Sequence, residues 1–506
     1  MSEKYCDVLI VGMDLAGLIT GAFLAKRGLS VIVLNFDKEL ASTKKDIQPN
    51  LVTHLDSKLF KSILGRLSIM DHELAVVRKL SIPYQVVLPN HRLDVFTDRD
   101  LFERELKREF PYDFKLVKEF YSSMDLFESV LDTETLQELI LPKTFQEKWK
   151  FKKFIQNSGL TERLSSYLED LKANLDIKTF LEAQLRFLAS TYSDNPYTYV
   201  ISKLLSNENC VLYEVKGGMG RLKKVFLDKI ESYSGVIKNN VHIEALEIEK
   251  RKIQGIRLAG FEGTIGCRYL LWNARVRSIE PFIPKSFWTH TMLKQIRSIT
   301  PKQYHFSIRY EINRDELPEG MKENLLFIAD PNKPLTGSNF FHVNVFQPTE
   351  LASHAPIFLN VSYLLEAEFL HSPKEFLQVI HDEISDHLHH LMPFAESLRL
   401  IFPLDQPATH EQEEGNLLFA LEKDDFEIFR ENAQENPIYE IVPKRFTDLF
   451  PISNRTFYKN LFLTSPEVLA ALGFEGKLLL GLKTIDLIWR EIEVSRKKAI
   501  RQRKIA

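Results

Sequence analysis

The sequence predicts an α/β plus α+β fold, in which a domain with a parallel sheet is interrupted by a second domain with an antiparallel sheet. Two observations predict it. Residues 8–39 have the pattern of a strand, a helix and a second strand. Further along the chain, four segments show the alternation and β-branched content of antiparallel strands. These segments are Tyr304–Ile312, Leu325–Ala329, Phe340–Phe346 and Ile357–Leu364.

The N-terminal unit has clear boundaries. An apolar strand, Val8–Val11, runs into Gly12, and a helix follows over about Leu15–Arg27. Gly28 ends the helix, and a second apolar strand covers Val31–Leu34. Acidic residues precede this apolar stretch and three glycines interrupt it, so we predict strand, turn and helix rather than a membrane span or a signal sequence.

The turn of this unit carries a dinucleotide-binding fingerprint with two changes. In the usual form, three glycines make the turn, admit the pyrophosphate and pack the helix on the strand, and an acid after the second strand binds ribose hydroxyls. Gly12, Gly17 and Gly21 are present. Asp14 stands where the second glycine belongs, and Asn35 stands where the acid belongs.

The two changes weaken the expected cofactor site. A carboxylate at Asp14 about 5 Å from a phosphate charge costs roughly 3 kcal/mol at an effective dielectric of about 20, which is about a hundredfold in affinity. The cost is smaller if the Asp14 side chain turns to solvent. Asn35 still accepts a ribose hydrogen bond, without the assistance of charge. A Rossmann-like half that holds no nucleotide therefore remains an alternative.

Composition narrows the class of protein. The chain has 506 residues, enough for two or more domains, and its 44% hydrophobic and 27% charged residues are ordinary for a globular protein. A formal net charge of −3 argues against nucleic-acid binding. The three cysteines form no motif, which indicates a reducing compartment, and we expect a cytoplasmic protein. Phenylalanine, with 36 residues, is in excess.

The remaining segments give a coarse order of elements. Residues 51–75 look helical, 84–97 form a hairpin pattern, and 100–206 are mostly helical. Residues 211–230 have the pattern of a strand, a glycine loop and a helix, 235–274 of several short strands, and 374–392 of a helix. The chain closes with a strand at Leu461–Leu463, a loop with glycines and a long helix.

Three separated segments carry a resemblance to a known family. The first is the N-terminal unit. The second comprises Lys216–Leu222, Asn239–Val241 and Leu271–Ala274, and the third is NLFLTSPEVLAALGFEGKLLLGLKTIDLI, residues 460–488. Together, in this order and spacing, they resemble the phytoene desaturase and carotenoid isomerase branch of the FAD-dependent amine oxidase superfamily.

The resemblance implies a domain organisation and a chemistry. Residues 1–80, 206–275 and 455–506 would form a Rossmann-like FAD/NAD(P)-binding domain, and 81–205 with 276–454 an inserted substrate domain with a helical lid. An active relative would use FAD to oxidise or isomerise a long apolar substrate or lipid. The flavin performs such chemistry and the protein positions it, so no catalytic side chain is named.

The resemblance also indicates which residues would meet the flavin. The glycine pair that normally follows the second strand is missing from residues 39–50, and Thr464 and Ser465 replace the glycine and acid of the closing segment. Gly473 and Gly476 remain near the start of the last helix, where backbone amides and the helix dipole favour an anion or the flavin ring. The expected cofactor-binding residues are Gly12, Asp14, Gly17, Asn35, Val241, Ser465, Gly473 and Gly476.

Other polar clusters have simpler interpretations. A helix carries His381, His387, His389 and His390, but no acid–histidine motif accompanies them, so we predict no metal site. Lys44 and Lys45 are a possible phosphate contact. The basic tail at residues 495–504 either complements the helix dipole or contacts an anionic membrane, which makes peripheral membrane association an expectation.

Three functions follow. The first is an FAD-dependent oxidoreductase or isomerase of the phytoene desaturase type with a weakened cofactor site. The second is a flavin-free relative that binds lipids or protein partners, as Rab GDP-dissociation inhibitors do on a similar fold. The third is a structural partner of an intact paralogue. The first two predict a large Phe-lined apolar cavity between the domains.

Overall fold

The computed structural model describes most of the chain. The described residues are 5–36, 51–74, 77–130, 140–142, 145–160, 162–169, 174–189, 191–206, 211–215, 218–261, 263–297, 299–346, 356–401, 423–434, 437–440 and 452–505. Segment 39–50, where the glycine pair is missing, and Lys44 and Lys45 lie outside them.

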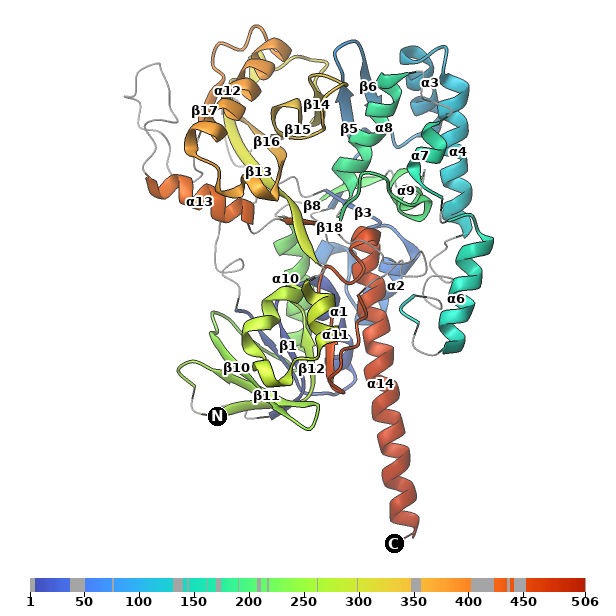
Figure 1. The fold of residues 1–506 in the computed structure, drawn as a ribbon, viewed down its shortest axis with the longest axis vertical. Coiled ribbons are helices and arrows are strands. Elements are labelled where there is room, and N and C mark those ends of the chain that lie inside the picture. The colour runs from blue at the N-terminus through green and yellow to red at the C-terminus, as the bar shows by residue number, and fades with distance from the viewer. Residues whose placement is uncertain are drawn as a thin grey trace.

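A sheet in the lower half of the molecule gathers strands from distant parts of the chain (Figure 1). Its central strand β1 (Tyr5–Val11) pairs in parallel with β12 (Thr264–Trp272) and β2 (Val31–Leu34). The order is β10 (Ile243–Glu249), β11 (Lys252–Leu258), β12, β1, β2 and β9 (Val236–Lys238), with β19 (Leu461–Leu463) on β12. The prediction that residues 235–274 and 460–488 join the N-terminal unit in one sheet is confirmed.

Helix α1 (Leu15–Lys26) is buried almost throughout because other elements cover it on several sides. It contacts α10 (Gly218–Ser232) and α14 (Gly473–Ile505). A Cβ on Gly21 would lie 2.6 Å from Ile10 Cδ1, and one on Gly481 would lie 3.0 Å from the Ala16 carbonyl oxygen. These glycines therefore allow α1 to pack closely on β1 and on α14, and the predicted strand–helix–strand unit is confirmed.

A second sheet lies in the upper half of the molecule (Figure 1). Its order is β6 (Arg92–Val95), β5 (Tyr84–Val87), β14 (Asn324–Ile328), β15 (Phe340–Phe346), β16 (Ile357–Glu366), β13 (Thr300–Ile312), β18 (Pro437–Glu440) and β7 (Thr191–Tyr192), with β17 (Arg399–Ile401) on β13. Strands β14, β15, β16 and β13 are antiparallel in register, which confirms the four predicted strands. The predicted helix that follows them is α12 (Lys374–Leu391).

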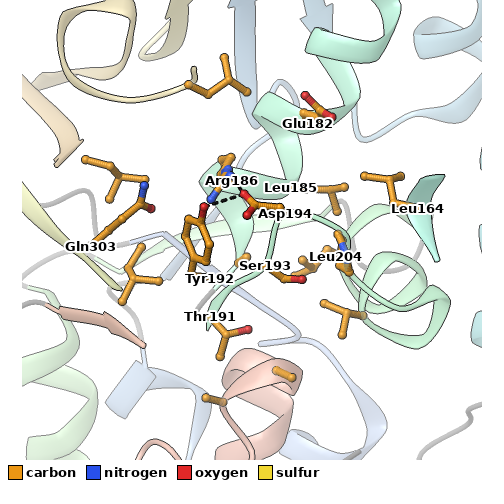
Figure 2. A pocket seen from close by; sticks show the side chains of 18 of the residues that line it. Leu164, Glu182, Leu185, Arg186, Thr191, Tyr192, Ser193, Asp194, Leu204 and Gln303 are labelled. Carbon is orange, nitrogen blue, oxygen red and sulfur yellow. Dashed lines mark hydrogen bonds and ion pairs between the residues drawn. The ribbon is translucent and has the colours of Figure 1, made fainter. Parts of the chain in front are cut away.

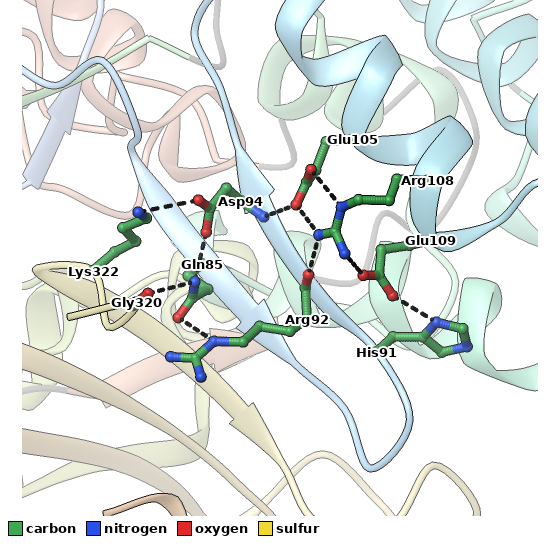
Figure 3. Close-up of polar contacts among 9 residues, drawn as sticks. All are labelled: Gln85, His91, Arg92, Asp94, Glu105, Arg108, Glu109, Gly320 and Lys322. Carbon is green, nitrogen blue, oxygen red and sulfur yellow. Dashed lines mark hydrogen bonds and ion pairs between the residues drawn. The ribbon is translucent and has the colours of Figure 1, made fainter. Parts of the chain in front are cut away.

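Charged side chains join the β5–β6 hairpin to its neighbours (Figure 3). Gln85 Nε2 donates to the Gly320 carbonyl at 3.1 Å and to Asp94, whose carboxylate also pairs with Lys322 at 3.3 Å. On the other side, the Asp94 amide donates to Glu105 of α3 (Arg99–Glu109) at 3.1 Å. The hairpin is thus fixed between the sheet and the helices.

The segment between the hairpin and β8 is mostly helical, as predicted. It contains α3, α4 (Phe114–Val130), α6 (Phe145–Asn157), α7 (Leu164–Leu168), α8 (Leu175–Leu188) and α9 (Thr198–Leu205). The chain also has α2 (Lys58–Leu67), α11 (His290–Arg297) and α13 (Lys423–Gln434). The prediction of helix from residue 51 is wrong at its start, because Leu51–Thr53 is strand β3, which pairs with β8 (Leu212–Val215) next to β4 (Val77–Lys79).

Helix α14 projects from the body of the molecule toward the C-terminus (Figure 1). Up to Ile492 it carries buried side chains such as Leu478, Ile485 and Ile492 at 0–1% exposure, whereas Val494 is 52% exposed. Among the described residues, no helix has the length and apolar character to cross a membrane. The expected contact of residues 495–504 with a membrane stays a prediction.

Candidate functional site

The turn between β1 and α1 is closed by Asn273, which directly follows β12. Its Oδ1 accepts from the Gly17 amide at 2.8 Å, and its Nδ2 donates to the carbonyls of Gly12 at 3.1 Å and Asp14 at 2.7 Å. A Cβ on Gly12, where φ is +100°, would lie 2.7 Å from the Ala274 nitrogen, and one on Gly17 would lie 2.2 Å from Asn273 Cγ. Both glycines are therefore required by contact with residues 273 and 274.

Asp14 does not turn to solvent. Its side chain is 11% exposed and its Oδ1 accepts from Lys477 Nζ of α14 at 2.8 Å. It is the N-cap residue of α1 but makes no side-chain capping hydrogen bond, and Asp14 Oδ2 is buried with no partner among the described residues. The cost of phosphate binding expected from the sequence includes the charge of Asp14 but not that of Lys477, which compensates it. The estimated repulsion of a phosphate is therefore too large.

Asn35 lies at the end of β2 with 1% exposure. Its Nδ2 donates to Asn239 Oδ1 at 3.3 Å, and its Oδ1 is buried with no partner among the described residues. Its backbone carbonyl accepts from the Val241 amide at 3.1 Å. The structure thus brings Asn35 and Val241 together and leaves one buried acceptor at the position where the resemblance places the ribose.

In the closing segment, Thr464 and Ser465 are buried, whereas Gly473 lines a cavity. Ser465 is fully buried and its hydroxyl donates to the Trp272 carbonyl at 3.1 Å, as the Thr464 hydroxyl does at 3.4 Å. A Cβ on Gly476 would lie 2.4 Å from the Leu469 carbonyl oxygen, so this glycine serves helix packing. Gly473, with φ +54°, begins α14 and lines a cavity. Of these residues, Gly473 alone is placed at an open site.

Two adjoining cavities lie against the nine-stranded sheet, near the start of α14. The first chamber has a volume of about 460 Å³ and is lined by α8, α9, the β7 region and the loop before α14 (Figure 2). The second chamber, of about 320 Å³, is lined by Gly473 and Lys477 on one side and by β13, β15 and β16 on the other. Arg186, Leu204 and Leu364 line both chambers, which makes them neighbours.

The chambers correct the expectation of a Phe-lined cavity. No phenylalanine lines the first chamber, whose aromatic walls are Tyr192, Tyr197 and Tyr199. Phe187, Phe340 and Phe474 line the second chamber. Many other phenylalanines, such as Phe180, Phe226 and Phe306, are fully buried in the core. Most of the phenylalanines therefore pack in the core. The amino-acid composition alone does not distinguish this role from ligand binding.

Burial shifts the pKa values of several titratable groups around the chambers in the direction that favours their neutral forms. It lowers the pKa of His305 to about 4, and burial together with the nearby His305 lowers the pKa of His342 to about 3. Both histidines line the second chamber. Burial raises the pKa of Glu467 to about 7, although its carboxylate accepts from the Val276 amide at 3.2 Å. The chamber walls thus suit an uncharged ligand.

The predicted residues fall into separate groups. Gly12, Asp14 and Gly17 meet at Asn273, and Asn35 meets Val241. Asn273 and Lys477 are missing from the predicted site residues. In the sequence, Asn273 stands out only as part of the family-like segment Leu271–Ala274. Nothing in the sequence indicates that Lys477 faces Asp14 across 463 positions.

The histidines of α12 have separate roles. His381 is buried and shares a hydrogen bond of 2.7 Å with the Tyr363 hydroxyl, while the His387 ring lies tilted against the Phe327 ring. The ring nitrogens of His389 and His390 contact backbone carbonyls of their own helix. Within the described part of the chain, no group of three or more His, Cys, Asp or Glu side chains is arranged to hold a metal ion.

Comparison with solved structures defines the class of fold. An oxidoreductase from Methanosarcina mazei superposes with a TM-score of 0.60 at 13% identity, covering 95% of this chain and all of that one. Cyclohexylamine oxidase from Brevibacterium oxydans gives a TM-score of 0.56 at 10% identity, covering 96% and 99%. The chain therefore shares its fold with these two solved proteins, an oxidoreductase and an amine oxidase.

Sequence comparison identifies two curated relatives of the chain. No family model matches the chain. A 4,4'-diapophytoene desaturase from Methylomonas is 24% identical over 270 residues, half of each chain. An inactive all-trans-retinol 13,14-reductase from Danio rerio is 21% identical over 269 residues, 49% of this chain and 43% of that one. The chain spans about half the length of these curated relatives, and over that part its sequence resembles the phytoene desaturase-like branch.

The residues present fit FAD. The first amides of α1 have no acceptor within the helix, although the Gly17 amide donates to Asn273, and the adjacent carboxylate of Asp14 is neutralised by Lys477. The unpartnered Asn35 Oδ1 is an acceptor for a ribose hydroxyl. Gly473 opens the N-terminus of α14 to the second chamber.

We expect the contact between Gly17 and Asn273 to show strong coupling. Gly17→Ala forces a Cβ into the Asn273 side chain, and Asn273→Ala removes three hydrogen bonds. Each single change should cost about 2–4 kcal/mol of unfolding free energy. The double variant should lose less than the sum of the two, because the shortened residue 273 leaves room for the methyl group.

Chemical denaturation of the four proteins measures this coupling. Gly65→Ala, where a Cβ meets no atom within 4 Å, is the matched control and should be neutral or slightly stabilising. Additive single effects would contradict the role given to Asn273.

We expect Glu467 to make stability depend on pH. Its pKa rises from 4.5 to about 7 on folding, so the folded state binds more protons between these values and stability falls as pH rises through this window. Glu467→Gln should remove the effect and gain up to about 3 kcal/mol over the parent chain at about pH 8. Thermal unfolding of both proteins from pH 5 to 8, with the exposed Glu319→Gln as control, measures the difference; a constant gap across this range would contradict the assignment.

Proposed function

We propose that this protein is an FAD-dependent oxidoreductase of the phytoene desaturase kind that acts on a long apolar substrate. The observation that carries the proposal is the ion pair between Asp14 and Lys477, which removes the electrostatic objection to a phosphate at the start of α1. The two adjoining chambers beside α14 supply space for a substrate. The similarity to a diapophytoene desaturase supports the class of substrate.

Each part of the site has a definite task in this function. FAD, when bound, supplies the acceptor for the two electrons removed from the substrate. The start of α1 and Lys477 would favour the phosphates, and Asn35 Oδ1 would accept from a ribose hydroxyl. The start of α14 at Gly473 lines the second chamber. The neutral histidines and the apolar side chains among the lining residues would contact the substrate.

A flavin-free binding protein is the second candidate. It is favoured because polar groups that would bind a cofactor already form hydrogen bonds with other protein atoms. The Gly17 amide bonds to Asn273, and the Ser465 hydroxyl bonds to Trp272. One relative, from Danio rerio, is itself named an inactive reductase. In this case the chambers would bind a lipid without redox chemistry.

We also propose a cytoplasmic location with peripheral membrane contact through residues 495–504. Cys6 and Cys267 are register neighbours on β1 and β12 and form no disulfide with each other, which suits a reducing compartment. An apolar substrate would reach the protein from a membrane, and the basic residues near the C-terminus would favour an anionic surface.

We expect the Asp14–Lys477 pair to control affinity for FAD. Lys477→Met leaves the Asp14 carboxylate uncompensated and should weaken FAD binding by about tenfold or more. Asp14→Gly frees Lys477 for the phosphates and should tighten binding by up to about a hundredfold. The double variant should return close to the parent affinity, because both charges are gone.

Titration of FAD, followed by its visible absorption and by calorimetry, measures these affinities. Arg490→Met removes an exposed cation from the same helix and should change nothing. Asp14→Asn separates loss of charge from loss of bulk. A freshly purified protein without the visible bands of oxidised flavin, and no FAD binding in any variant, would favour the flavin-free candidate.

A further inference from the structure

Gln303 of β13 is a buried amide that lacks hydrogen bonds. Its side chain lines the first chamber and is 1% exposed. Neither Nε2 nor Oε1 has a hydrogen-bond partner among the described residues. Figure 2 shows the amide directed toward the side of the chamber formed by Tyr192 and Arg186.

This state is unusual for an amide in a protein interior. A buried polar group without a partner costs about 1–3 kcal/mol, so such groups generally have a role or a missing partner. Gln184 of α8 provides the contrast within the same chain. It is 0% exposed, and its amide accepts from the Tyr84 hydroxyl at 3.0 Å and donates to the Phe180 carbonyl at 3.2 Å.

Neighbouring polar groups of the chamber are already paired with protein atoms. Arg186 and the Tyr192 hydroxyl both donate to Asp194, at 2.8 and 2.6 Å (Figure 2). Arg163 stacks on the Tyr197 ring at 3.5 Å and donates to the Asn195 carbonyl at 2.8 Å. Arg186, Tyr192 and Arg163 already bond to protein atoms, whereas the Gln303 amide has no such partner and can bond to a ligand.

The charged side chains that line the chamber nearly balance, so the chamber offers no net positive charge to an anionic ligand. Four acids line it, Glu182, Asp194, Glu366 and Glu467, against three cations, Arg163, Arg186 and Lys333. The complement of a carboxamide in such surroundings is a neutral polar group. Its oxygen accepts from a hydroxyl and its nitrogen donates to a carbonyl, and the broad terminal torsion of glutamine allows it to present either atom.

We propose that Gln303 binds the neutral polar end of an otherwise apolar ligand, an alcohol or the corresponding aldehyde, in the first chamber. The ligand chain then extends past Leu204 and Leu364 into the second chamber, beside Gly473. The inference rests on the apolar substrate of the proposed function and adds that this substrate carries oxygen at one end.

Binding of a polyene alcohol tests the proposal. The probes are all-trans-retinol and the hydrocarbon in which its hydroxyl is replaced by hydrogen, with affinity measured by quenching of tryptophan fluorescence. The parent protein should prefer the alcohol by about tenfold. Gln303→Leu should abolish this preference while its affinity for the hydrocarbon stays the same.

Controls separate recognition from stability. Gln378→Leu, on α12 and outside both chambers, should keep the preference for the alcohol. In thermal unfolding, Gln303→Leu should be neutral or stabilising, whereas Gln184→Leu should destabilise because it removes partners from Tyr84 and Tyr121.

Equal affinity of the parent protein for the two probes, no binding of either, or a Gln303→Leu protein that keeps the preference would overturn the proposal. A protein without FAD would give a different result. It would lack the flavin spectrum but would still bind the alcohol more tightly than the hydrocarbon.

Discussion

The rest of the structure depends on the contact that Asn273 makes with the turn before α1. One side chain bonds the carbonyls of Gly12 and Asp14 and the amide of Gly17, and so joins the end of β12 to the start of the helix. Because β12 also pairs with β19, the same junction fixes the loop that leads to α14. The position of Lys477 against Asp14, and of both chambers beside α14, follows from this junction.

Because Lys477 pairs with Asp14, the altered fingerprint does not by itself argue against phosphate binding. A lone carboxylate at the start of α1 would oppose a phosphate, but a carboxylate paired at 2.8 Å presents little net charge. The changes at Asp14 and Asn35 are therefore not equivalent. Asp14 has acquired a partner from another part of the chain, whereas Asn35 keeps a buried acceptor without a donor.

Much of the fold follows from local sequence patterns, and the site follows only in part. The strands around Val8–Val11 and Tyr304–Ile312 are predictable because their periodicity is set by burial of one or both faces. Strand β3 is not, because three residues are too few to show a period and pairing with β8 decides their conformation. The roles of Lys477 and Gln303 depend on contacts with segments far away in sequence, which no local pattern encodes.

The closure of the β1–α1 turn also has a consequence for the order of folding during synthesis. The partner of Gly17 lies 256 positions later in the chain, and α14, which covers α1, is made after that. At about 5–20 residues per second, the N-terminal unit waits on the order of ten seconds or more for Asn273 and again as long for α14. During that interval the apolar surface of α1 is exposed on the ribosome, so this chain should depend on chaperones that bind nascent apolar helices.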